Sequence, residues 1–156
     1  RLGSERIKSC FALYPAAHLT HPERLDTVMG CVSDKFRSGV VIPHWCMKLF
    51  INAYTTPGTD MNDPRLSPMF YDASKFPKYV AVACGDADTL YRMSFDLMKK
   101  ISGSASGTNV DGSRRFICVP NEAHEFNTFG RTRASQEERD RVEGEAINMI
   151  RASWRQ

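Results

Sequence analysis

Two short polar segments carry the side chains that could do chemistry. Gly85-Asp86-Ala87-Asp88-Thr89 holds two carboxylates, and Pro120-Asn121-Glu122-Ala123-His124 ends in a histidine. Imidazole can take up and return a proton near neutral pH. A carboxylate on one ring nitrogen fixes the tautomer and stabilises the imidazolium, which leaves the other nitrogen free to act as a base. The two segments therefore predict an acid–base pair that includes His124, with either Asp86 or Asp88 as the acid.

The elements expected around these segments would bring them to one edge of a sheet. Apolar runs predict strands over residues 7–14, 79–84 and 115–119, the first two buried on both faces. Helical spacing predicts helices over 41–53 and 90–101, and a capping box at 135–138 begins a last helix that runs to about residue 154. This alternation predicts an α/β fold with a mainly parallel sheet and flanking helices. Ligands bind beyond the carboxyl ends of such strands, and both polar segments follow carboxyl ends.

Three segments, in chain order, resemble the C-terminal half of the hormone-sensitive-lipase-like esterases of the α/β-hydrolase superfamily. Asp63-Pro64-Arg65-Leu66-Ser67-Pro68 is similar to the family's D-P-x-x-S-P loop, Gly85–Leu90 to its G-x-x-D-P-L motif, and Pro120–Phe126 to its P-G-x-x-H-G-F loop. The resemblance implies that Asp88 is the acid and His124 the base of a catalytic triad. It also implies a carboxylesterase-type serine hydrolase that cleaves small-molecule esters through an acyl-serine, without a metal or an organic cofactor.

The serine nucleophile of such a triad is expected before the acid, in a G-x-S-x-G turn between a strand and a helix. The sequence contains no such motif. Gly3 stands directly before Ser4 and not two residues before it, and Arg6, not a glycine, stands two residues after it. The family's glycine-rich oxyanion segment is absent as well. We therefore expect residues 1–156 to be the C-terminal portion of a single α/β-hydrolase domain that needs its missing N-terminal half and is inactive alone.

The segment over residues 19–54 is long for a connection between two strands and is a candidate for a cap or lid over the substrate. Trp45, Leu49 and Phe50, together with Met47, would then line a substrate pocket; alternatively, they only pack on the sheet.

Four positions depart from the family's pattern. Thr89 replaces a proline, Arg92 stands where a second acid is usual, and Asn121 and Glu125 replace glycines. The departures keep open a non-catalytic ligand-binding protein, or an inactive fragment, on the same fold. A third alternative is a peptidase of the same fold, which would need a pocket for a peptide chain.

Composition argues against several other classes of protein. The net charge is only +3, and the arginines of residues 131–141 alternate with acidic residues, which is typical of a solvated helix face and not of a nucleic-acid surface. Five cysteines without a C-x-x-C pair favour a reducing, cytoplasmic compartment, and Cys10, Cys84 and Cys118 lie in apolar runs as small hydrophobic residues would. His18 and His21 lack the partners of a zinc site. No apolar run approaches the length of a membrane span.

Overall fold

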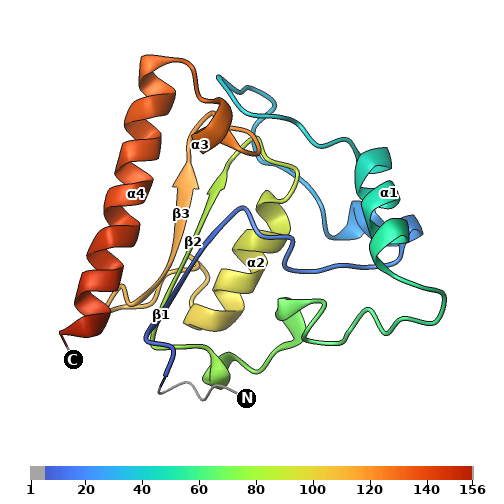
Figure 1. Ribbon diagram of the computed structural model, residues 1–156, viewed down its shortest axis with the longest axis horizontal. Helices are drawn as coiled ribbons and strands as arrows, with labels where there is room; N and C mark the ends of the chain where they lie inside the picture. The colour runs from blue at the N-terminus through green and yellow to red at the C-terminus, as the bar shows by residue number, and fades with distance from the viewer. Residues whose placement is uncertain (1–5, 156) are drawn as a thin grey trace.

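A computed structural model describes residues 6–155 and shows a three-stranded sheet (Figure 1). The strands β1 (Ser9–Leu13), β2 (Tyr79–Gly85) and β3 (Arg114–Val119) lie in the order β1-β2-β3 and are all parallel. Ser9 is opposite Tyr79, and Val80 is opposite Arg114. Each strand lies within two residues of its expected bounds, and the predicted α/β class with a parallel sheet is confirmed.

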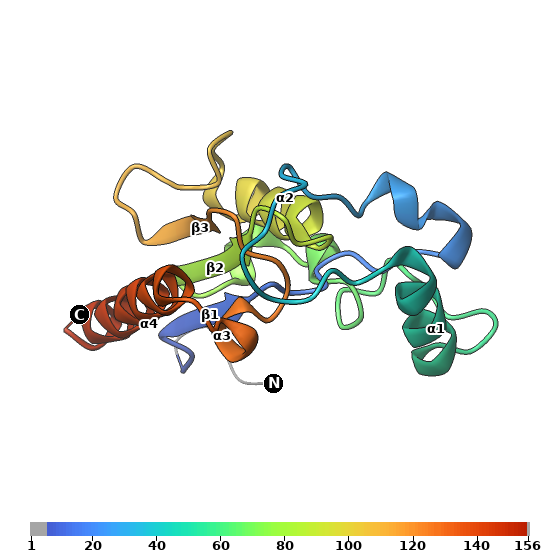
Figure 2. The same ribbon diagram turned by 90° about the horizontal axis from the view of Figure 1, so that it is seen from above.

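Helices cover both faces of the sheet (Figure 2). Helix α2 (Tyr91–Ser102) lies on one face and helix α4 (Arg133–Trp154) on the other. The central strand β2 alternates between them: Val80 and Val82 join a cluster with the α2 side chains, whereas Ala81 and Ala83 join a cluster with those of α4. Both faces of β2 are therefore buried, which explains its apolar sequence.

The edge strand β1 is less buried than expected. Its five residues are exposed or partly exposed, because among the described residues only β2 pairs with it. The expectation that this strand is buried on both faces is therefore wrong for the chain as described. The cysteines follow the same division: Cys84 on β2 is buried, whereas Cys10 on β1 and Cys118 on β3 are exposed.

Residues 19–54 form a lobe beside the N-terminal end of α2 (Figures 1 and 2). The lobe contains the 3₁₀ turn η1 (Pro22–Thr27) and helix α1 (His44–Tyr54). Its core consists of buried aliphatic side chains from the lobe, the following loop and α2: Leu25, Met29, Met47, Ile51, Met61, Leu90 and Met93. The turns η2 (Pro68–Phe70) and η3 (Ala73–Lys75) then lead into β2.

The last two helices follow β3. Helix α3 (Phe126–Phe129) is a single turn, and α4 begins after Thr132, whose hydroxyl accepts a hydrogen bond from the Ser135 backbone N–H at 3.1 Å. The capping box expected at 135–138 is therefore wrong by three residues. Ser135 lies inside the first turn, is fully buried and faces the loop after β3.

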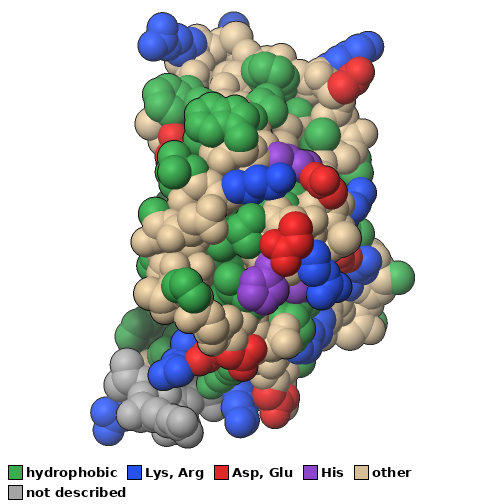
Figure 3. All heavy atoms as spheres, turned by 90° about the vertical axis from the view of Figure 1, so that its right-hand side faces the viewer, with side chains coloured by type: hydrophobic (Ala, Val, Ile, Leu, Met, Phe, Trp, Pro, Cys, Tyr) green, Lys and Arg blue, Asp and Glu red, His purple; other side chains and the backbone are tan. Residues whose placement is uncertain are grey.

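The surface of the lobe is mixed in character. On the face in Figure 3, basic, acidic and histidine side chains lie between hydrophobic ones and do not merge into a basic patch. Within residues 6–155, no helix combines the length and the apolar character needed to cross a membrane.

Candidate active site

Asp88 and His124 meet at the carboxyl edge of the sheet. Asp88 follows β2 and His124 follows β3, and the Asp88 Oδ2 lies 2.8 Å from the His124 Nδ1. The Asp88 Oδ1 accepts a hydrogen bond from the Leu90 backbone N–H at 2.8 Å. Asp88 is completely buried, whereas 17% of the His124 side chain is exposed. Asp88 thus both holds the first turn before α2 and orients the histidine ring.

The rival acid, Asp86, has a different position. Its Oδ1 accepts a hydrogen bond from the Asn121 backbone N–H at 2.7 Å, and it makes no hydrogen bond to His124. The two loops approach each other closely at Gly85, where a Cβ would lie 2.0 Å from the Glu122 carbonyl oxygen. Asp86 and Gly85 therefore hold the histidine loop against the acid loop, and Asp88 supplies the carboxylate that His124 contacts.

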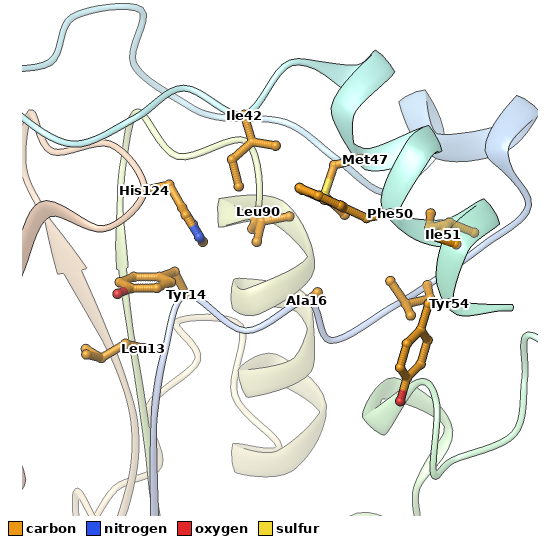
Figure 4. Close-up of a pocket in the computed structure, with 12 residues that line it drawn as sticks. Leu13, Tyr14, Ala16, Ile42, Met47, Phe50, Ile51, Tyr54, Leu90 and His124 are labelled. Carbon is orange, nitrogen blue, oxygen red and sulfur yellow. The ribbon is translucent and has the colours of Figure 1, made fainter. Parts of the chain in front are cut away.

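The His124 ring opens onto an apolar pocket of about 640 Å³ (Figure 4). The pocket lies between the carboxyl end of β1, the start of α2 and helix α1, and none of its lining side chains carries a fixed charge. The lining residues are Leu13, Tyr14, Ala16, Leu19, Ile42, Met47, Phe50, Ile51, Ala53, Tyr54, Leu90 and His124. In Figure 4 the ring of His124 points into the space between Tyr14 and Leu90. The histidine therefore faces a space that suits an uncharged, apolar group.

Only part of α1 faces this pocket. Phe50 and Met47 line it, as the sequence suggested, but Trp45 and Leu49 do not. These two side chains are 67% and 57% exposed and lie on the outer side of α1, while Met47 and Ile51 form its buried stripe. The expectation that Trp45, Leu49 and Phe50 act together is therefore not what this pocket shows.

Tyr14 is a neighbour of His124 that the sequence did not reveal. Its ring lies edge-on to the imidazole with 4.3 Å between the centroids, and its hydroxyl donates to the Asn127 Oδ1 at 2.8 Å. Burial raises the pKa of the Tyr14 phenol, and the nearby charges of Glu125 and Asp88 raise it further. The phenol therefore stays protonated as a donor. Its position directly after β1, at the same sheet edge as the two polar loops, was the available signal.

The departures from the family's pattern are accommodated in two ways. Asn121 and Glu125, which stand in place of glycines, have φ angles of 57° and 55°, in the left-handed region that glycine adopts readily. Thr89 donates its hydroxyl to the Ile42 carbonyl at 3.1 Å, and the Arg92 guanidinium packs against Gly30. The backbone course that glycines would favour is thus kept, and Thr89 and Arg92 contact residues of the lobe.

The described residues offer neither a metal cluster nor a serine bonded to His124. No group of three or more His, Cys, Asp or Glu side chains within 6–155 is placed to hold a metal ion. The His124 ring shares a hydrogen bond with Asp88 and with no serine of this part of the chain. Ser4 lies outside the described residues. His44 pairs with Asp26 at the surface of the lobe and does not line the pocket.

A family model described as alpha/beta hydrolase fold matches residues 1–128. The chain belongs to the α/β-hydrolase fold family. The resemblance found in its three loops is thereby confirmed at the level of the family. No curated protein matches the sequence significantly.

Solved structures share the fold at low sequence identity. Brefeldin A esterase, described as a bacterial homologue of human hormone-sensitive lipase, matches 95% of the chain with a TM-score of 0.64 and 20% identity. A mutant of LAE6, an α/β-hydrolase enzyme from the metagenome of Lake Arreo, matches 85% with a TM-score of 0.55 and 18% identity. Carboxyl esterase 2 of the fungus Tuber melanosporum matches 97% with a TM-score of 0.50 and 17% identity. The chain spans 41%, 39% and 46% of these three proteins, respectively, which is less than half of each.

Proposed function

We propose that this chain supplies the acid and the base of a carboxylic-ester hydrolase, with a serine nucleophile that comes from outside the described residues. The observation that carries the proposal is the fully buried Asp88, held 2.8 Å from the Nδ1 of a histidine whose ring opens onto an apolar pocket. The described segment would be the C-terminal portion of one α/β-hydrolase domain, with residues 19–54 as a cap over the pocket. Two of the matched structures are of proteins named as esterases, which supports this reaction class.

The reaction would proceed in two steps. In the first, the His124 Nε2 takes the proton of the serine hydroxyl while the serine oxygen attacks the ester carbonyl, and the imidazolium returns that proton to the leaving alcohol. In the second, His124 takes a proton from water, the hydroxide attacks the acyl-serine, and the serine oxygen regains the proton as the acid leaves. Asp88 would hold Nδ1 protonated throughout and stabilise the imidazolium in its buried position.

The pocket indicates what kind of ester would fit. None of its lining residues carries a fixed charge, and most are aliphatic or aromatic. A small or medium uncharged acyl group would be stabilised there by burial, whereas a charged group would lose its hydration without a partner.

The experiment uses a fluorophosphonate, which labels activated serines, and intact-mass measurement. The samples are the 156-residue chain and the longest natural reading frame that contains it, each with and without His124→Ala. His44→Ala is the matched control, because His44 also pairs with an aspartate but lies on the surface. We expect no adduct on the 156-residue chain, and one adduct on the longer product that His124→Ala removes and His44→Ala leaves.

Three results would contradict the proposal. An adduct on the 156-residue chain that depends on His124 would mean that one of its own serines is the nucleophile. A longer product that is not labelled would have no activated serine, and a longer product that is labelled equally after His124→Ala would mean that His124 is not the base. In the unlabelled case, a protein that binds an apolar ligand without cleaving it becomes the better account of the pocket.

A further inference from the structure

A second buried carboxylate lies two residues before His124. Glu122 is completely buried and receives three hydrogen bonds from two other segments of the chain. Its Oε1 accepts from the Arg37 Nε at 3.1 Å and from the Ser135 hydroxyl at 2.8 Å, and its Oε2 accepts from the Ser38 hydroxyl at 2.5 Å. A carboxylate without water is costly unless it is paired and hydrogen-bonded, and these three donors meet that need.

One of the two segments runs directly along the histidine loop. Residues 37–40 form bridges with it, Ser38 with Glu122 and Val40 with His124. The Val40 backbone N–H donates to the His124 carbonyl at 2.7 Å, and the His124 N–H donates to the Val40 carbonyl at 3.1 Å. The Ala123 N–H also donates to the Ser38 carbonyl at 3.0 Å. Both backbone hydrogen bonds of His124 thus go to the segment that Glu122 holds.

The same segment is fixed to the loop from its other end. The Arg37 N–H donates to the Asn121 carbonyl at 2.7 Å, and its guanidinium donates to the Pro120 carbonyl at 2.8 Å. Gly39, with a φ of 94°, lets the two backbones approach, because a Cβ there would lie 2.4 Å from the His124 carbonyl oxygen. Ser135 ties the carboxylate to the first turn of α4. Three separate elements therefore meet at one side chain next to His124.

We propose that Glu122 is a positioning residue, which clamps residues 37–40 and α4 around the histidine loop and so keeps His124 in reach of Asp88. It does not touch the pocket, and it acts through the backbone of His124. In its relation to catalysis this inference rests on the proposed function, because a precise histidine matters only if His124 transfers protons. The clamp itself is a property of the fold and can be tested without any activity.

The test is nuclear magnetic resonance on the 156-residue chain, with two readouts. The first is the hydrogen-exchange rate of the His124 amide, compared with that of Val82 in the centre of the sheet. The second is the resonance of the His124 Nδ1 proton, which is sharp and far downfield when the ring is held on a carboxylate. In Glu122→Ala we expect the His124 amide to exchange faster than in the unmodified chain by roughly tenfold or more beyond any change at Val82. The Nδ1 proton signal should broaden or disappear.

Two further variants make the result specific. Glu122→Gln keeps the length of the side chain and one acceptor oxygen, so its effect should be smaller than that of Glu122→Ala. Glu145→Gln is the matched control, because Glu145 on α4 also pairs with an arginine, Arg115 at 2.8 Å, but is remote from the histidine loop. It should leave both readouts unchanged.

The outcomes separate the clamp from simple stability and from the proposed reaction. Equal acceleration at His124 and Val82 with a sharp Nδ1 signal would show that Glu122 only stabilises the fold, and would overturn the proposal. If Glu122→Ala does not fold, Ser38→Ala removes one of the three contacts and is judged by the same comparison of amide exchange at His124 and Val82. Absence of the Nδ1 signal in the unmodified chain would count against the Asp88–His124 pair and hence against the proposed function. The exchange rate of the His124 amide relative to that of Val82 would still test the clamp.

Discussion

Replacement of Gly39 by alanine should disturb the histidine loop, because the added Cβ would collide with the backbone of that loop. The alanine Cβ would lie 2.4 Å from the His124 carbonyl oxygen and 2.9 Å from that of Ala123. Ordinary contacts of this kind begin at 3.4 Å, so the two backbones must separate by about 1 Å. A separation of that size would stretch the two hydrogen bonds between Val40 and His124, now 2.7 and 3.1 Å, beyond or close to the limit of a useful hydrogen bond.

The expected cost follows from these contacts. Two lost backbone hydrogen bonds contribute about 1 kcal/mol each, or about 2 kcal/mol together. The positive φ of 94° adds about 1–2 kcal/mol for any residue with a Cβ. For a domain of this size, each kcal/mol lowers the unfolding midpoint by roughly 2–4 °C. Gly39→Ala should therefore lower the midpoint by roughly 6–16 °C.

Gly58 provides a matched control for the backbone contribution. It has a similar φ of 85°, but a Cβ there would meet no atom within 4 Å. Thermal unfolding followed by circular dichroism should show a decrease for Gly39→Ala that exceeds the decrease for Gly58→Ala by roughly 4–8 °C, the part due to the close approach. Equal midpoints for the two variants would refute the reasoning that the approach of residues 37–40 holds the histidine loop.

The remaining predictions concern the acid, the pocket and the pH dependence of stability. In a longer product that is labelled and active, Asp88→Asn should lower kcat by about 10³–10⁴-fold, because the His124 ring is no longer held in the correct tautomer. Asp86→Asn should lower kcat by about tenfold at most. Similar losses in both variants would contradict the assignment of the acid. In the same product, Phe50→Ala should raise KM for apolar esters and Trp45→Ala should not, since Phe50 lines the pocket and Trp45 does not. The opposite order would exclude this pocket as the acyl site. A neighbouring arginine lowers the pKa of Asp63 to about 2 from 3.8. Because the folded-state pKa is the lower one, Asp63 stabilises the fold above about pH 4, and this contribution is lost as the pH falls toward 2. Asp63→Asn should flatten that part of the stability curve in low salt, and an unchanged slope would contradict the pairing.

The strands and the acid–histidine pair could be predicted because local sequence determines them. Apolar runs of five to eight residues mark the three strands, and the rule that parallel strands carry ligands at their carboxyl ends places Asp88 and His124 together. Which aspartate reaches the ring is a matter of loop geometry. Asp86 accepts a hydrogen bond from the Asn121 backbone, whereas Asp88 contacts the His124 ring. The resemblance to a family, not the spacing, chose between them.

The face of α1 could not be predicted because its sequence is apolar nearly all round. Trp45, Met47, Leu49, Phe50 and Ile51 admit more than one helical stripe, and the largest side chains suggested the wrong one. The buried stripe, Met47 and Ile51, is set by the neighbouring side chains of η1 and α2, which only the tertiary structure brings together.

Tyr14 and Glu122 escaped prediction for a related reason. Tyr14 lies next to His124 only because segments far apart in the sequence come together at one sheet edge. Glu122 is near His124 in the sequence, but it is buried only because distant segments surround it. A lone glutamate in a polar loop is ordinarily exposed. Its burial depends on Arg37, Ser38 and Ser135, which arrive from two other elements and form no sequence motif.

The histidine loop shows how these tertiary contacts can replace local preference. Asn121 and Glu125 stand in place of glycines of the resembling family, yet both keep the left-handed backbone, with φ angles of 57° and 55°. For a residue with a Cβ that conformation costs about 1–2 kcal/mol, less for asparagine, which makes a different backbone course locally preferable for Glu125. The loop keeps its course because Val40 holds both backbone groups of His124 and the Ala87 N–H holds the Glu122 carbonyl at 3.1 Å. The position of His124 is therefore imposed by the contacts that Glu122 and residues 37–40 make, and not by the local backbone preference of the loop.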